Sequence, residues 1–131
     1  MIEKDDELRK IIFNLIKSNG PIHMSEFMSI CLYDSNYGYY KNSKVIGNKG
    51  DFITSPEISQ VFGELIALSV FNNAKKSGIN KINFLELGPG KGTLISDILN
   101  TIGKIKSNRF ELNPLLYEKN TILKEVQKKS F

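Results

Sequence analysis

The residues best suited to bind a ligand form one run, Glu86-Leu87-Gly88-Pro89-Gly90-Lys91-Gly92-Thr93. A carboxylate ends an apolar segment here, and three glycines follow it at alternate positions. Glycine lets the backbone approach a ligand closely because it has no Cβ, but each glycine also loses extra backbone entropy on folding. The run therefore predicts a ligand-binding turn between a strand and a helix, whose first N–H groups are free to bind.

The spacing of the three glycines indicates which ligand this turn suits. A dinucleotide site has G-x-G-x-x-G for the pyrophosphate, whereas Gly88, Gly90 and Gly92 give G-x-G-x-G. A P-loop needs Ser or Thr after its Gly-Lys pair, and Gly92 occupies that position after Lys91. The pattern E-x-G-x-G-x-G instead resembles motif I of the S-adenosylmethionine-dependent methyltransferases, whose cofactor has a charged amino-acid end and a cationic sulfur.

A second candidate for cofactor binding is Glu111, which follows Gly92 by 111 − 92 = 19 residues. In nucleotide-binding α/β domains, an acidic residue about 20 residues beyond the glycines binds the ribose hydroxyls. We expect Glu111 at the end of a short strand over Arg109–Leu112. A solvated carboxylate before the turn at Leu112-Asn113-Pro114 is an equally weighted alternative.

Apolar spacing predicts the elements that position these residues. Leu8, Ile12 and Ile16 belong to one helical stripe that Gly20-Pro21 ends. Further along the chain we expect a helix over Ser25–Leu32, an enclosed helix over Ser59–Lys76, a buried strand over Lys81–Leu87, a helix over Leu94–Ile102 and a last helix over Pro114–Val126. The stretch between Tyr33 and Pro56 is long and irregular, which is typical of a functional loop.

A more particular resemblance rests on several motifs in a fixed order. They are Gly20-Pro21-Ile22, Phe27-Met28, Tyr37-Gly38-Tyr39-Tyr40, the loop Gly50-Asp51-Phe52-Ile53-Thr54-Ser55-Pro56-Glu57-Ile58-Ser59, Phe62-Gly63-Glu64-Leu65 and the glycine run. Together they resemble the MidA family of S-adenosylmethionine-dependent methyltransferases. That family includes a mitochondrial complex I assembly factor with the character of a protein-arginine methyltransferase.

The resemblance implies a role for each matching residue. The implied cofactor-binding residues are Glu86, Gly88, Pro89, Gly90, Gly92 and Thr93 of the glycine run, Thr54 and Pro56 of a segment folded over the cofactor, and Glu111 at the ribose. An arginine substrate needs carboxylates around its guanidinium, and Glu57 and Asp51 are the predicted catalytic residues. Pro56 and Glu57 also fit an ordinary helix start after Ser55, and both roles are compatible.

The predicted fold is α/β, with an N-terminal helical arm and the first βαβ unit of a Rossmann-like class I methyltransferase sheet. We expect residues 1–78 to form a helical lid region and residues 79–131 to begin the cofactor-binding domain. The family's sheet has seven strands and only two are visible, so we expect an N-terminal fragment that is inactive alone and pairs with a complementing C-terminal chain. The alternatives are a non-enzymatic assembly fragment and a piece of a nicotinamide- or flavin-binding oxidoreductase.

Composition limits the partners of this 131-residue chain, which is 40% hydrophobic with a net charge of +4. The lysines are scattered, so we expect no nucleic-acid partner, and no apolar run reaches membrane-spanning length. His23 is the only histidine, which excludes a His-based metal site, and Cys31 is expected to be buried. The acidic N-terminus argues against a signal or transit peptide. We expect a cytoplasmic bacterial protein, with the mitochondrial matrix as the alternative, acting on a protein such as a respiratory complex I subunit.

Overall fold

The computed structural model describes residues 2–41, 51–105 and 110–130. Gly50 and Arg109, which belong to the predicted loop and strand, lie outside these ranges. Contacts divide the chain into two compact units, Met1–Ser43 and Lys44–Phe131, and the segment before the sheet groups with the second unit. The domain boundary predicted after residue 78 stays a prediction. Within the described ranges, no helix combines the length and apolar character needed to cross a bilayer.

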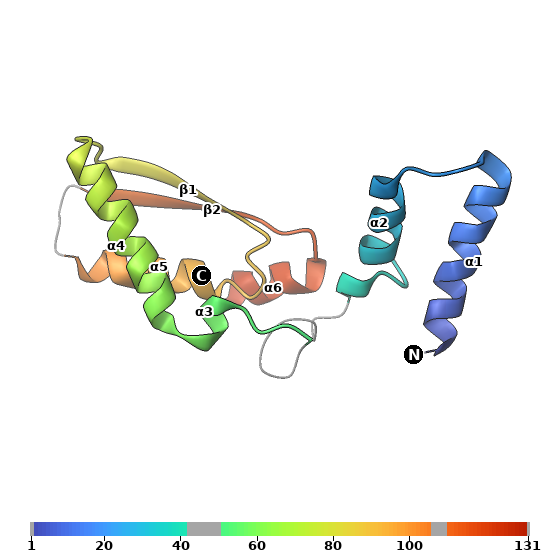
Figure 1. The fold of residues 1–131 in the computed structure, drawn as a ribbon. Helices are drawn as coiled ribbons and strands as arrows, with labels where there is room; N and C mark the ends of the chain where they lie inside the picture. Colours follow the sequence, from blue (N-terminus) through green and yellow to red (C-terminus); the bar gives the residue numbers. More distant parts are fainter. Residues whose placement is uncertain (1, 42–50, 106–109, 131) are drawn as a thin grey trace. The chain divides into compact units, whose positions relative to one another are not determined.

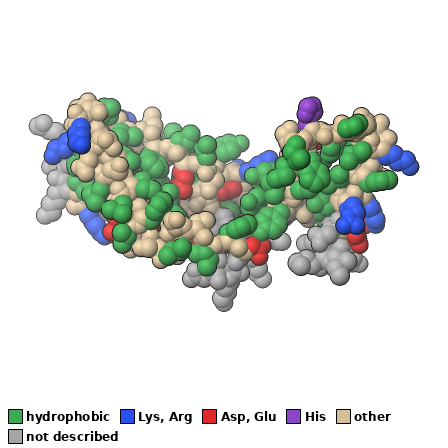
Figure 2. Space-filling model, viewed as in Figure 1, with side chains coloured by type: hydrophobic (Ala, Val, Ile, Leu, Met, Phe, Trp, Pro, Cys, Tyr) green, Lys and Arg blue, Asp and Glu red, His purple; other side chains and the backbone are tan. Residues whose placement is uncertain are grey.

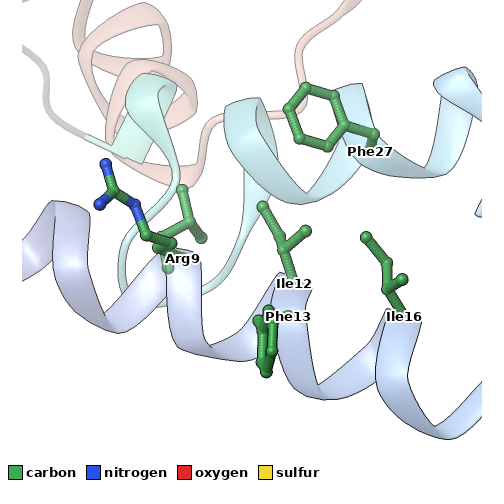
Figure 3. Close-up of a pocket in the computed structure, with 6 residues that line it drawn as sticks. Arg9, Ile12, Phe13, Ile16 and Phe27 are labelled. Atoms are coloured by element: carbon green, nitrogen blue, oxygen red, sulfur yellow. The ribbon is translucent and has the colours of Figure 1, made fainter.

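The first unit begins with two helices, α1 (Ile2–Asn19) and α2 (Met24–Tyr33), as the apolar spacing predicted (Figure 1). Gly20 ends α1 in the left-handed region at φ 80°, and its N–H donates to the Ile16 carbonyl at 2.8 Å. A hollow of about 360 Å³ lies along α1 and is lined by Leu8, Arg9, Ile12, Phe13, Ile16 and Phe27. Figure 3 shows Ile12 and Ile16 pointing from α1 toward α2, which carries Phe27. Apart from Arg9, the residues that line this hollow are apolar, so it is a mainly apolar groove.

A tight turn after α2 accounts for the motif Tyr37-Gly38-Tyr39-Tyr40. The Asp34 carboxylate accepts the N–H groups of Asn36 and Tyr37, both at 2.9 Å, and these bonds lower the pKa of Asp34. Gly38 is buried here, and a Cβ on it would lie 2.5 Å from the Asp34 backbone nitrogen. A short 3₁₀ helix, η1 (Tyr39–Lys41), follows. The glycine in this motif is therefore required by a close backbone approach.

In its described residues, the second unit is built on a two-stranded parallel sheet. Strand β1 (Lys81–Leu87) pairs with β2 (Glu111–Tyr117), so that Lys81 lies opposite Glu111 and Leu87 opposite Tyr117. The helices of this unit are α3 (Ser55–Ile58), α4 (Gln60–Lys76), α5 (Thr93–Lys104) and α6 (Thr121–Ser130). Figure 1 shows α5 and α6 on the same side of both strands. The order β1-α5-β2 is the predicted βαβ unit.

The core of this unit lies between α4, α5 and the sheet. Ile95 and Ile98 of α5 are fully buried, and Ala67 and Ala74 are the buried alanines of α4. Gly63 is also buried on α4, and a Cβ on it would lie 2.5 Å from the Asp97 Cβ. Small residues on α4 therefore let it pack closely against the helix that follows the glycine run.

Several burial predictions differ from the structure. Helix α4 was expected to be enclosed, but the described chain covers one side of it, and Val61 and Leu65 are 54% and 61% exposed. Figure 2 shows hydrophobic side chains along α4 in this view. Strand β1 was expected to be buried, but Leu85 and Leu87 are exposed because the described helices pack on the opposite face of the sheet. Cys31 is half-buried rather than buried.

The predictions for the segment after α5 were wrong about where β2 and the last helix lie. The strand continues through Pro114 to Tyr117, and the final helix begins only at Thr121. Proline is tolerated in β2 because, among the described strands, β2 pairs on one side only. Asn120 starts the helix, since its Oδ1 accepts the N–H groups of Ile122 at 2.8 Å and Leu123 at 3.3 Å.

Candidate cofactor-binding site

The glycine run forms the predicted turn between β1 and α5. Gly88, Gly90 and Gly92 have φ values of 67°, 58° and 83°, a region that side chains with a Cβ rarely adopt. The Gly88 N–H donates to the Tyr117 carbonyl at 2.8 Å, and the Gly92 N–H donates to the Pro89 carbonyl at 2.8 Å. Gly92 is the N-cap residue of α5. All three glycines are thus needed for the path of the backbone.

A cavity of about 180 Å³ opens beside this turn, at the carboxyl end of β1 and the N-terminus of α5. In α/β sheets, this is the usual location for a ligand. Its lining consists of Thr54, Pro56, Glu57, Glu86, Gly88, Pro89, Gly90, Lys91, Thr93 and Leu94. Eight of the predicted site residues are in this set. Asp51, Gly92 and Glu111 are not among the lining residues, and Asp51 is exposed.

Glu86 gives the cavity its most informative chemical group. Its Oε2 is buried and has no hydrogen-bond partner among the described residues. Burial raises the pKa of Glu86, and a hydrogen bond from the Ile95 backbone N–H partly opposes that shift. A buried carboxylate oxygen without a partner fits a cationic group of a ligand, and the nearby N-terminus of α5 fits an anionic one. The donor and acceptor groups therefore fit an amino-acid zwitterion.

Glu57 joins the α3 segment to the start of α5. The Thr93 hydroxyl donates to Glu57 Oε1 at 2.6 Å, and Lys91 Nζ lies 3.5 Å from Glu57 Oε2. The Glu57 side chain is only 15% exposed. Because each carboxylate oxygen has a partner, Glu57 holds the overlying segment against the glycine turn, and its catalytic role stays a prediction.

Glu111 lies at the wrong end of the sheet for the position predicted from sequence. It begins β2 instead of ending it, and it pairs with Lys81 at 2.8 Å on an exposed surface. A seven-residue strand is about 20 Å long, which separates Glu111 from the glycine turn. The count of about 20 residues failed because β2 starts where it was expected to stop. The geometry gives no support to Glu111 as the ribose ligand.

Glu118 occupies the position that the sequence reasoning assigned to Glu111. It follows the carboxyl end of β2, and its Oε2 accepts the Gly90 N–H at 3.3 Å while its Oε1 accepts the Asn120 N–H at 2.8 Å. The residue was missed, although Leu115-Leu116-Tyr117-Glu118 repeats the pattern of an apolar run ending in a carboxylate. Recognising Asn120 as a helix cap would have placed the end of the strand just before it.

Comparison with known proteins agrees with this geometry. Residues 65–131 match the model of a protein family described as "Putative S-adenosyl-L-methionine-dependent methyltransferase". The matched segment runs from α4 to the end of the chain and contains the glycine turn, Glu86 and Glu118.

Curated relatives and solved structures match almost the whole chain. The mitochondrial protein arginine methyltransferase NDUFAF7 homolog of Caenorhabditis elegans is 39% identical, covering 98% of this chain and 31% of its own length. Mitochondrial NDUFAF7 of Bos taurus is 42% identical, covering 92% of this chain and 28% of its own length. A Burkholderia thailandensis protein, crystallised bound to S-adenosyl-homocysteine, superposes with a TM-score of 0.77 at 25% identity, covering 98% of this chain and 34% of that one. The chain thus spans about a third of the length of these proteins.

Proposed function

The chain belongs to this family of S-adenosyl-L-methionine-dependent methyltransferases, and from that premise we propose that its glycine turn binds the methionine end of S-adenosylmethionine. The observation that carries the proposal is the buried Glu86 Oε2, which has no partner among the described residues and lines the cavity beside the turn. It would accept a hydrogen bond from the cofactor ammonium group. The N–H groups at the start of α5 would face the cofactor carboxylate.

We assign the ribose hydroxyls to Glu118. Its position after β2 corresponds to that of the acidic ribose ligand in nucleotide-binding α/β domains. Each of its oxygens already accepts one backbone N–H. A carboxylate offers about four lone-pair sites, so both oxygens keep capacity for a hydroxyl donor. Thr54 and Pro56, from the segment around α3, would cover the methionine end from the other side.

The proposed reaction is methyl transfer to an arginine nitrogen of a protein, the activity in the names of the NDUFAF7 relatives. S-adenosylmethionine supplies an activated methyl group when it is bound, and the residues described here act by holding and orienting it. Glu57 and Asp51 remain the proposed contacts to the arginine guanidinium. A subunit of respiratory complex I, suggested by the motif resemblance, is the proposed substrate. The relatives' names do not support the expected cytoplasmic location, and we propose the mitochondrial matrix instead.

Calorimetric titration of the chain with S-adenosyl-homocysteine, S-adenosylmethionine and NAD tests the cofactor assignment. We expect both sulfur cofactors to bind and NAD not to bind. Glu86→Ala should abolish the binding, while Glu111→Ala, which removes an exposed carboxylate at the other end of the sheet, should leave it intact. Binding of NAD alone would support the oxidoreductase alternative, and binding of none of the three would favour the non-enzymatic fragment.

The acceptor is tested separately, with arginine-containing complex I subunits and methyl-labelled cofactor. The assay is run with the chain alone and with a complementing C-terminal chain. Where methyl transfer occurs, mass spectrometry should locate the label on arginine. Label on lysine or on a carboxylate in place of arginine would contradict the proposed acceptor without affecting the cofactor assignment.

A further inference from the structure

The central glycine of the turn is held by two side chains from the segment after β2. The Gln127 side-chain amide donates from Nε2 to the Gly90 carbonyl at 2.6 Å. Glu118 Oε2 accepts the Gly90 N–H at 3.3 Å. These contacts reach back 37 and 28 residues along the chain. Both polar groups of Gly90 therefore depend on α6 and the residues just before it.

Gln127 is placed where an apolar side chain would be expected. It follows Leu123 by one helical turn on the same face of α6, and the two residues are 6% and 7% exposed. Burying an amide is unfavourable unless it is hydrogen-bonded, so Gln127 is tolerated because it has the Gly90 carbonyl as a partner. The same bond satisfies the carbonyl of a glycine that is itself buried.

The bond also fixes the direction of the next peptide N–H. The Gly90 carbonyl and the Lys91 N–H belong to one planar trans peptide, in which the two groups point in opposite directions. Because Gln127 holds the carbonyl toward α6, the Lys91 N–H must point away from α6. Gly90 and Lys91 both line the cavity assigned above to the methionine end of the cofactor.

We propose that Gln127 is a positioning residue, which orients the Gly90–Lys91 peptide so that its N–H can bind the carboxylate of the cofactor. The inference rests on the proposed function for the identity of the ligand. The orientation of the peptide in the free protein does not depend on that identity. Helix α6, with no other assigned part in the site, thereby sets the shape of the glycine turn.

The first measurement uses the full chain without ligand. Gln127→Met keeps the length of the side chain and removes the amide donor. Gln127→Glu keeps the shape of the side chain and replaces the amide donor with a carboxylate, which only accepts hydrogen bonds. Lys129→Met is the matched control at an exposed position of the same helix. We expect both Gln127 variants to shift the Lys91 amide ¹⁵N resonance and to speed hydrogen exchange at Gly90. The Lys129 variant should change neither. Unchanged Lys91 and Gly90 signals in the two Gln127 variants would overturn the proposal.

The second measurement is the affinity for S-adenosyl-homocysteine, determined by calorimetry. The parent chain and the variants are compared under conditions in which the same fraction of each protein is folded. Losing one buried hydrogen bond should weaken binding about tenfold in both Gln127 variants and by less than about twofold in Lys129→Met. If the parent chain binds no S-adenosyl-homocysteine, the proposed function fails for this chain, whereas the free-protein spectra still decide the role of Gln127. A shift of the Lys91 resonance with unchanged affinity would overturn the link to the cofactor.

Discussion

The two ends of the short sheet use polar residues in opposite ways. At the amino end, Lys81 pairs with Glu111 at 2.8 Å and the Asn113 amide donates to the Asn83 side-chain oxygen at 3.0 Å, all on an exposed surface. Each of these contacts joins directly opposed residues of β1 and β2. They connect two strands that the backbone ladder already holds together.

At the carboxyl end, polar side chains connect segments that the ladder does not join. Glu57 reaches the start of α5, while Glu118 and Gln127 hold the central glycine of the turn. Exposed ion pairs contribute about 0–1 kcal/mol to the stability of the folded state. A buried polar group that loses its partner lowers that stability by about 1–3 kcal/mol. Burial and distance along the chain, more than residue type, therefore distinguish the end of this sheet that carries the proposed binding site.

A large difference in cofactor affinity should separate variants of the two glutamates at opposite ends of β2. Glu118→Ala removes a charged hydrogen-bond acceptor from the turn and from the proposed ribose contact, so affinity for S-adenosyl-homocysteine should fall about 10–100-fold. Glu111→Ala should change affinity by less than about twofold. Isothermal titration of both variants checks the comparison, and equal losses would show that the two ends are not functionally distinct.

Alanine substitutions at the two glycines that flank β1 distinguish the effect of backbone strain on stability from an effect on cofactor binding. Gly78 and Gly88 have φ values of 69° and 67°, and a Cβ on either meets no other atom within 4 Å. Alanine at each position should therefore lower the free energy of unfolding by a similar amount, about 1–2 kcal/mol, because both keep a left-handed backbone. Urea denaturation measures that loss. Only Gly88→Ala, at the carboxyl end, should also weaken cofactor binding, and weakened binding in Gly78→Ala would contradict the assignment.

The smallest effect concerns the pH dependence of stability at the two ends. Burial raises the pKa of Glu86 in the folded chain, so the folded state binds more protons than the unfolded state between the two pKa values, and stability falls as pH rises through that window. Glu86→Gln should remove this decline and stabilise the free protein at neutral pH. Glu111→Gln, which breaks the exposed pair with Lys81, should instead slightly destabilise it. Thermal melts from pH 4 to 8 measure this dependence. If the stability of Glu86→Gln and that of the parent chain changed with pH in parallel, the burial effect would be refuted.

The sequence could predict most of the carboxyl end of β1, because there the local signals agree. An apolar run, a carboxylate and three alternate glycines together predict a strand, a tight turn and a helix. In the structure, β1 covers the residues predicted for the strand. The motif order also predicted the family, and the family match confirms it. The cavity lining includes Thr54 and Pro56, which the resemblance alone brought to the site.

The region after α5 was mispredicted because one local signal, a proline, was misleading. Pro114 resembles the first residue of a helix, yet it lies inside β2, which pairs on one side only among the described strands, and there tertiary pairing overrides its local preference. That error placed Glu111 at the wrong end of β2 and concealed Glu118. The role of Gln127 has no sequence signal, since a glutamine at an inward position of a helix shows neither its partner nor its burial.

Parallel pairing across a helix also constrains when this site can form during synthesis. Among the described strands, β1 has no partner until β2 has left the ribosome. The turn is not held until Gln127 follows, 127 − 87 = 40 residues after the end of β1. Strand β2 is complete 117 − 87 = 30 residues after β1, so at about 5–20 residues per second the nascent chain carries an unpaired apolar strand for about 1.5–6 s. A chaperone that shields exposed strand edges would therefore act on this protein chiefly in that interval, before the glycine turn is held in place.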